Sequence, residues 1–179
     1  MSEKIKLTAV QDNIMRGIKI AKVTLNIGSG KDEEMHKKGL KLLQKLSEEI
    51  KPVSTVTTKR IPGWNLRPGL KIGCKATIRK NTIELLKRLL AAKNQVLSAD
   101  NFDNQGNFSF GVPEYIDIKG LDYDPELKIM GLEVAVTLQR AGFRVKQRRI
   151  KRSRVGKTHL ISRDEAMAFA KDKLQVEVR

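Results

Sequence analysis

Hydrophobic and polar residues alternate with a period of two in four segments of the chain, the pattern of strands that bury one face. These segments are 20–27, 72–79, 107–112 and 131–139. In the first, the apolar face carries Ala21, Val23, Leu25 and Ile27, and the polar face carries Lys22, Thr24 and Asn26. In the second, the apolar face carries Ile72, Cys74, Ala76 and Ile78, and the polar face carries Lys75, Thr77 and Arg79. The β-branched segment 52–59 predicts a further strand whose faces the alternation does not resolve.

Three other segments have helical spacing and a start signal. Ser29-x-x-Asp32 opens the first helix, which ends before Pro52 and has Met35, Leu42, Leu43, Leu46 and Ile50 at helical spacing. Asn81-x-x-Glu84 opens the second helix, whose inward residues are Ile83, Leu86, Leu89 and Leu90. Ser162-x-x-Glu165 is a capping box for the third, at about 162–174, with Ala166, Phe169 and Ala170 inward.

This order of elements predicts an α+β fold with a mostly antiparallel sheet and helices packed on one face. The other sheet face would then carry Lys, Thr, Asn and Arg side chains in water, which suits a flat, positively charged binding surface. A chain of 179 residues with 40% hydrophobic residues can bury a core, and we expect one domain over 1–179.

The charge is uneven along the chain and changes this picture. There are 36 basic and 20 acidic residues, yet the stretch from Val134 to Arg163 has ten basic residues and no acid. Removing these ten leaves a net charge of +6, which we expect to be spread over the rest. Clustered like charges repel unless a polyanion neutralises them, so this stretch favours nucleic acid. An anionic membrane surface and a disordered basic arm stay open as alternatives.

Residue types exclude several other functions. One cysteine and two histidines do not make a disulfide framework or a metal site, and the first ten residues lack the apolar core of an export signal. The turn 26–31 resembles a phosphate loop but lacks the residues of both nucleotide fingerprints. No catalytic constellation stands out, so we expect no cofactor and no enzyme.

Some residues allow two interpretations. Trp64, in the Pro- and Gly-rich loop 59–71, is either a lid over the core or a contact to a partner. Phe108 and Phe110 could stack on RNA bases, but they share a face with Val112, which favours core packing. The basic loop 139–159 is too long for an ordinary connection, which favours a functional role or disorder. Cys74 lies in an apolar strand pattern, which favours a buried thiol.

Five dispersed segments resemble a known family. They are DNIMRGIKIAKVTLNIGSG (12–30), GLKLLQKL (39–46), RPGLKIGCKATIR (67–79), GNFSFGVPEYID (106–117) and LDYDPELKIMGLEVAV (121–136). Together they resemble the universal large-subunit ribosomal protein that binds 5S rRNA, the fifth in the conventional numbering. NFSFG and the ending GKTHLIS are similar to its archaeal and eukaryotic branch.

The resemblance implies a structural constituent of the large ribosomal subunit, in the cytoplasm, that helps attach 5S rRNA in the central protuberance. Its implied partners are 5S rRNA, large-subunit rRNA, peptidyl-site tRNA, neighbouring ribosomal proteins and a small-subunit head protein at an inter-subunit bridge. The implied rRNA-binding residues are Lys22, Thr24, Asn26, Gly28, Gly30, Arg67, Lys71, Lys75, Thr77 and Arg79. The implied tRNA-binding residues are Arg144, Lys146, Arg148, Arg149, Lys151, Arg152, Arg154 and Lys157.

Two rival functions remain at this point. The chain could be a free-standing RNA-binding module or chaperone outside the ribosome, which co-sedimentation with large subunits in high salt would decide. It could also be an enzyme acting on RNA, which would need an acid–base or metal-ligand cluster near the basic loop.

Overall fold

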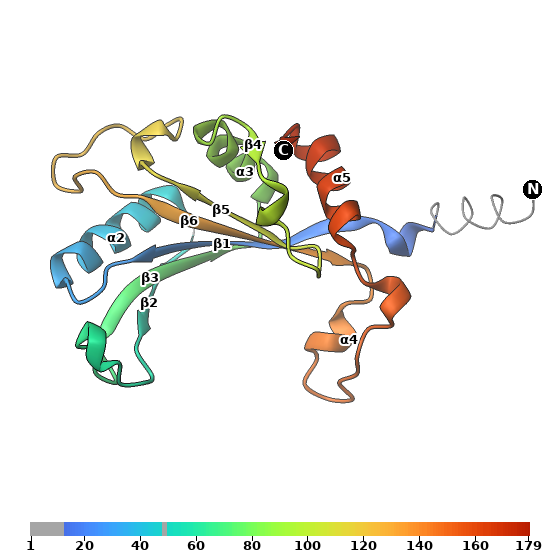
Figure 1. Ribbon diagram of the computed structural model, residues 1–179, viewed down its shortest axis with the longest axis horizontal. Coiled ribbons are helices and arrows are strands. Elements are labelled where there is room, and N and C mark those ends of the chain that lie inside the picture. The colour runs from blue at the N-terminus through green and yellow to red at the C-terminus, as the bar shows by residue number, and fades with distance from the viewer. Residues whose placement is uncertain (1–12, 48–49) are drawn as a thin grey trace, which may run out of the picture.

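The computed structural model describes residues 13–47 and 50–179, drawn in Figure 1. The expectation about an export signal, and the first residue of the segment 12–30, lie outside this part of the chain. Five strands form one antiparallel sheet in the order β2-β3-β1-β6-β5. In chain order their bounds are β1 (Ile18–Gly28), β2 (Val53–Val56), β3 (Lys71–Ile78), β5 (Phe108–Val112) and β6 (Leu132–Arg140). The predicted fold class is therefore confirmed.

The central strand β1 confirms most of the predicted alternation. Val23, Leu25 and Ile27 are buried, and the residues between them are only partly covered. The ladder to β6 shifts by one residue between Ile20 and Lys22, so Ala21 sits in a β-bulge and Ile20 packs on the core instead. Placing Ala21 on the apolar face was wrong, because strict alternation does not anticipate an inserted residue.

Two helices cover one face of the sheet, namely α2 (Glu33–Leu46) and α3 (Thr82–Ala92). Asp32 caps α2 by accepting hydrogen bonds from the backbone N–H groups of Glu34 and Met35. The expected extension of this helix to Ile50 was wrong, since it ends at Leu46, where the Ser47 hydroxyl donates to the carbonyl of Leu43.

The second helix presents a slightly different face from the one expected. Ile83, which we placed inward, has 48% of its surface exposed, whereas Leu85 is buried with Leu86, Leu89 and Leu90. Asn81 precedes α3 in the left-handed conformation and makes no side-chain cap. This entry geometry turns the first helical turn away from the direction that spacing alone predicted.

The C-terminal part packs beside α3. Helix α5 (Arg163–Leu174) begins with the predicted capping box of Ser162 and Glu165, and it buries Ala166, Ala170 and Leu174. After it, β7 (Glu177–Val178) pairs in parallel with β4 (Val96–Leu97), a two-residue pairing that the sequence did not indicate.

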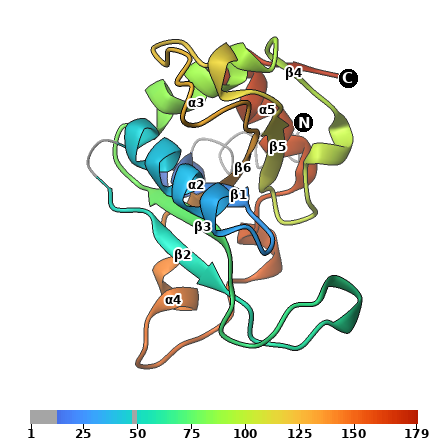
Figure 2. The same ribbon diagram turned by 90° about the vertical axis from the view of Figure 1, so that its left-hand side faces the viewer.

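The other sheet face is free of helices among the described residues, and two segments project on that side. One is the loop 57–70, which includes the 3₁₀ turn η2 (Pro62–Trp64). The other is the basic arm, which we define as residues 141–160, with α4 (Arg144–Gln147) and the 3₁₀ turn η5 (Lys157–His159). Figures 1 and 2 both show these segments below the sheet, on the side opposite α2 and α3. We call this side of the sheet the open face.

Candidate nucleic-acid interface

The centre of the open face is a set of polar side chains on adjacent strands. In the ladder between β1 and β3, Asn26 lies opposite Lys75 and Thr24 lies opposite Thr77. In the ladder between β1 and β6, Lys22 lies opposite Thr137. Because paired residues in an antiparallel ladder share a face, these side chains form one continuous surface of cations, hydroxyls and an amide.

Glu133 is an acid at the middle of this surface, which the list of expected site residues omitted. It lies opposite Asn26 in the ladder, and the Asn26 side-chain amide donates a 3.0 Å hydrogen bond to the Glu133 carboxylate. This contact occupies one Asn26 donor and leaves its carbonyl oxygen as an acceptor. Glu133 therefore orients Asn26, and the alternation of 131–139 already placed it on the polar face.

The turn after β1 is accessible, but two of its backbone donors are already used. The N–H groups of Ser29 and Gly30 both donate to the carbonyl of Ile72, at 2.9 and 3.1 Å. The adjoining N-terminus of α2 carries three carboxylates, Asp32, Glu33 and Glu34, which repel an anion. A Cβ at Gly28 or Gly30 would meet no atom within 4 Å, so these glycines leave room for close approach of another backbone.

The remaining expected rRNA-binding residues lie at the edge of this surface. Lys71 is exposed at the start of β3, and Arg79 is exposed just beyond its end. Arg67 is exposed on the loop 57–70, which Thr57 closes through its backbone and hydroxyl bonds to Leu70. The structure therefore brings five residues together on β1 and β3 and places the other five around them.

Most of the net charge lies in two segments rather than one. Residues 51–83 contain eight basic residues and no acid, in addition to the ten between Val134 and Arg163, so the rest of the chain has 18 basic and 20 acidic residues. The expected even spread of the remaining +6 was therefore wrong, and counting acid-free stretches would have found the second segment. On the helix side, Glu126 and Asp124 pair with Lys41 and Lys45 of α2, so acids are neutralised away from the open face.

The basic arm exposes all eight of its cations, and its backbone is held by short-range contacts. The guanidinium Nε of Arg148 donates to the carbonyl of Lys151, and that of Arg152 donates to the carbonyl of Lys146. The N–H of Ser153 donates to the carbonyl of Val145, which brings the two sides of the arm together. The arm is thus a folded projection whose charges point into solvent.

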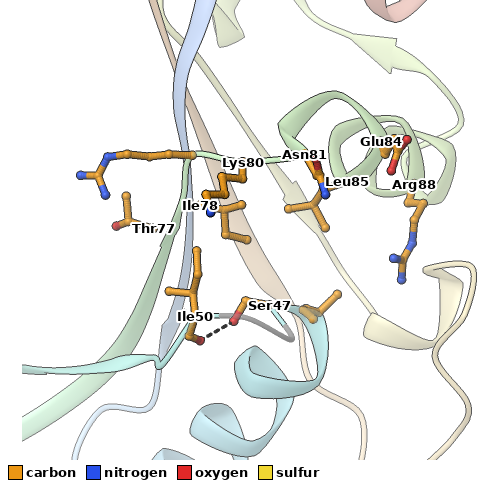
Figure 3. A pocket seen from close by; sticks show the side chains of 11 residues that line it. Ser47, Ile50, Thr77, Ile78, Lys80, Asn81, Glu84, Leu85 and Arg88 are labelled. Atoms are coloured by element: carbon orange, nitrogen blue, oxygen red, sulfur yellow. Dashed lines mark hydrogen bonds between the residues drawn. The ribbon is translucent and has the colours of Figure 1, made fainter.

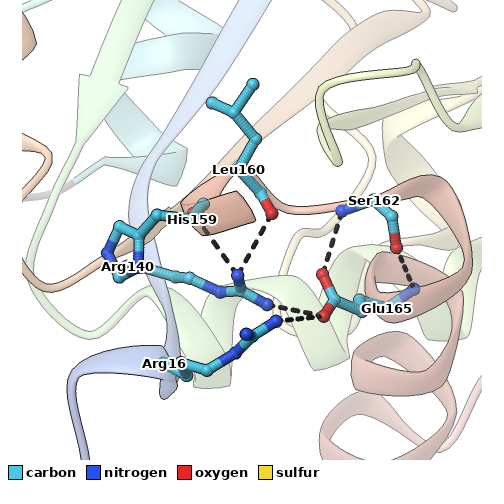
Figure 4. A network of polar contacts seen from close by, with 6 residues as sticks. All are labelled: Arg16, Arg140, His159, Leu160, Ser162 and Glu165. Atoms are coloured by element: carbon cyan, nitrogen blue, oxygen red, sulfur yellow. Dashed lines mark hydrogen bonds and ion pairs between the residues drawn. The ribbon is translucent and has the colours of Figure 1, made fainter. Parts of the chain in front are cut away.

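A buried ionic network fixes the base of the arm (Figure 4). Arg140, the last residue of β6, is 3% exposed and donates to the carbonyls of His159 and Leu160 at the other end of the arm. Its guanidinium also lies 2.7 Å from the Glu165 carboxylate, which Arg16 approaches to 3.4 Å. Although it is one of the ten cations of the acid-free stretch, Arg140 therefore acts in the structure and is unavailable to a polyanion.

The charge of Glu165 is stabilised by this network. Burial alone would raise the pKa of Glu165, but the N–H of Ser162 and the guanidinium groups of Arg140 and Arg16 hold the pKa below its ordinary value of 4.5. A carboxyl with a depressed pKa in the folded state stabilises the fold above its unfolded pKa. That contribution is lost as the pH falls through the folded pKa.

We therefore expect Glu165→Gln to lower the melting temperature at neutral pH, with a difference from wild type that shrinks as the pH falls below about 4.5. The glutamine keeps the capping acceptor, so the loss reports the charge rather than the cap. Thermal melts between pH 7 and pH 3 measure it, and Asp164→Asn on the same helical turn is the matched control. A difference that grows towards acid pH would contradict this assignment.

A hollow between the end of α2 and the start of α3 has no catalytic arrangement (Figure 3). Its walls combine apolar and basic side chains with the single acid Glu84. Over residues 13–47 and 50–179, no group of three His, Cys, Asp or Glu side chains could hold a metal ion. No helix in the same ranges is long and apolar enough to cross a membrane.

Three residues with two interpretations are now assigned. Phe108 and Phe110 are buried in the core, as favoured. Cys74 is buried, and burial raises its thiol pKa to about 11, which makes it unreactive at neutral pH. Trp64 is 69% exposed, so it is no lid over the core, and its role as a partner contact stays open.

A helix-free sheet face between two acid-free cationic projections defines a scaffold for binding a polyanion. Comparison with known proteins makes this class specific. The family model for the C-terminus of the ribosomal protein uL5 family matches residues 71–169. The chain is 46% identical over 166 residues to the large ribosomal subunit protein uL5 of Nanoarchaeum equitans, which covers 92% of this chain and 97% of that protein.

Two further relatives support the same assignment. The large ribosomal subunit protein uL5 of Sulfolobus acidocaldarius is 40% identical over 95% of this chain and 96% of its own length. That of Methanococcus maripaludis is 42% identical over 92% of each chain. The chain belongs to the ribosomal protein uL5 family, in its archaeal form.

Membership of this family answers the broad question of function. The protein is a structural constituent of the large subunit of the cytoplasmic ribosome, and its partners are ribosomal RNA and other ribosomal proteins. The family is not enzymatic, so neither the free-standing module nor the RNA-acting enzyme remains a competing explanation.

Proposed function

We propose that this protein holds 5S rRNA on its open face and helps attach it in the central protuberance of the large subunit. The basic arm reaches towards the peptidyl-site tRNA and, with the surface beside it, contributes to a bridge to a small-subunit head protein. The binding is non-covalent: Lys and Arg neutralise phosphates and fix register, while Asn26 and the strand threonines reach sugars or base edges.

One observation carries the proposal for 5S rRNA. The side chains of Lys22, Thr24, Asn26, Lys75 and Thr77 lie on one rigid surface with no helix over it among the described residues. RNA duplexes are recognised mainly by shape, phosphates and 2′-hydroxyls, which short polar side chains on a flat sheet can reach. Glu133 directs the Asn26 amide so that its carbonyl oxygen is free to accept from a 2′-hydroxyl.

A separate observation supports the role of the arm. Its eight cations are exposed, and the Arg140 network anchors its two ends to β6 and α5. A projection that is fixed at its base and charged along its length can reach a second RNA that the sheet does not contact. This arrangement separates a 5S rRNA surface from a tRNA surface within one chain.

We expect Asn26→Ala to weaken 5S rRNA binding about three- to tenfold, as for loss of one net hydrogen bond. The dependence of affinity on salt should not change, because asparagine carries no charge. Lys75→Gln should instead reduce the slope of log affinity against log salt by about one. Filter binding of transcribed 5S rRNA over a KCl series measures both quantities.

Two comparisons keep this test specific. Asn26→Ala also frees the Glu133 carboxylate, so the substitution is repeated in a Glu133→Gln background, where a similar loss is expected. Unchanged affinity in both backgrounds would remove Asn26 from the binding surface. A wild-type protein that bound 5S rRNA no better than an unrelated RNA of equal length would overturn the proposed function.

A further inference from the structure

The loop 57–70 presents the single tryptophan of the chain to solvent. Its outer part is a small hairpin in which Ile61 and Leu66 exchange two backbone hydrogen bonds of 3.1 Å. The 3₁₀ turn Pro62–Trp64 forms its end, where the N–H of Trp64 donates to the carbonyl of Ile61. Asn65, in the left-handed conformation, completes the turn. The loop is therefore shaped by its own backbone and holds Trp64 in position.

Packing does not explain this arrangement. Leu66 is buried and anchors the hairpin, whereas the indole of Trp64 is 69% exposed and Ile61 beside it is 37% exposed. An exposed indole gives up the burial that usually retains a tryptophan in a fold. A large aromatic side chain held in water at the end of an ordered projection indicates a binding contact.

The surroundings of Trp64 select the kind of partner. Lys59, Arg60 and Arg67 are exposed on the same loop, within the acid-free stretch 51–83. The loop projects on the same side as the open face and the basic arm (Figures 1 and 2). A cationic loop with a single aromatic residue at its end matches nucleic acid, because phosphates attract the charges and a base stacks on the ring.

We infer that Trp64 stacks on an unpaired base of ribosomal RNA, with Arg60 and Arg67 neutralising the flanking phosphates. Bases within a helix are already stacked on both sides, so the partner is a bulged or looped nucleotide of either 5S rRNA or large-subunit rRNA. This inference rests on the proposed function and adds a contact outside the sheet surface.

The lone tryptophan makes the test direct, since all indole emission comes from this loop. The full chain is titrated with transcribed 5S rRNA and, separately, with large-subunit rRNA, while filter binding follows complex formation. Stacking should quench the emission with one of the two RNAs, which identifies the source of the base. Trp64→Leu should weaken binding to that RNA by roughly five- to hundredfold, and Trp64→Phe by much less.

The outcomes separate this inference from the proposed function. Complexes that form without any change of indole emission, and with equal affinity for Trp64→Leu, would overturn the stacking contact and leave the sheet surface intact. Emission that changes only in assembled subunits, and with neither RNA alone, would assign Trp64 to a protein pocket and also overturn it. Failure to bind either RNA would instead refute the proposed function. Trp64 is exposed, so thermal melts of the variants should match wild type.

Discussion

Replacing Arg148, Arg149, Lys151 and Arg152 of the basic arm by glutamine should leave 5S rRNA binding within about twofold of wild type and weaken the contact to peptidyl-site tRNA in assembled ribosomes. At roughly 0.5 kcal/mol for each exposed charge pair, four losses sum to about 2 kcal/mol, or roughly thirtyfold in affinity. Filter binding measures the first quantity, and tRNA retention on large subunits reconstituted with the variant measures the second.

A charge-preserving control is needed because two of these arginines also shape the arm. Arg148 and Arg152 each donate from Nε to a backbone carbonyl of the arm. Replacing the three arginines by lysine keeps the charge and removes these donors. If the lysine variant retains tRNA, the effect of the glutamine variant is electrostatic. Collapse of 5S rRNA binding in the glutamine variant would mean that the two surfaces are assigned wrongly.

The second large effect concerns the contact that seats α2 on the sheet. A Cβ at Gly39 would lie 2.8 Å from the Cys74 sulfur and 3.4 Å from a methyl carbon of Ile27, both closer than normal packing. We expect Gly39→Ala to destabilise the fold by about 2 kcal/mol, because an overpacked core costs more than the ~1 kcal/mol gained in helix propensity. In a chain of this size that lowers the melting temperature by roughly 4–8 °C.

A double-mutant cycle identifies the cause. Cys74→Ala removes the sulfur that the new methyl group would meet, so Gly39→Ala with Cys74→Ala should be more stable than the sum of the single effects allows. Gly111→Ala is the matched control, since a Cβ there meets no atom within 4 Å. Additive losses would show that the helix and strand are not in the close contact described here.

The open face also explains why a neutral residue such as Asn26 matters among so many cations. Lysine and arginine contacts to phosphate supply affinity that falls with salt, and they do not distinguish one RNA from another. An oriented amide on a rigid strand adds a contact whose geometry must match. The pairing of Asn26 with Glu133 supplies this orientation, because the acid receives one amide hydrogen and so selects the side-chain rotamer.

The sequence by itself determined the fold class, four alternating strands and the capping box of α5, because these depend on local periodicity and capping chemistry. It also indicated the basic arm, since an acid-free run of cations is visible without coordinates. Its errors at Ala21, Ile50 and Ile83 arose where a bulge, a helix end and a helix entry depend on tertiary packing.

Only the tertiary structure decided which polar residues share a surface. Strand order and register place Asn26 between Lys75 and Glu133, residues that are far away in the chain, and no local pattern encodes that pairing. Folding also separated Arg140, which is buried against Glu165, from the exposed cations of the same run, and it left Trp64 in solvent. The physical reason is that burial and pairing depend on contacts between distant segments, whereas periodicity reports only which side of its own element a residue occupies.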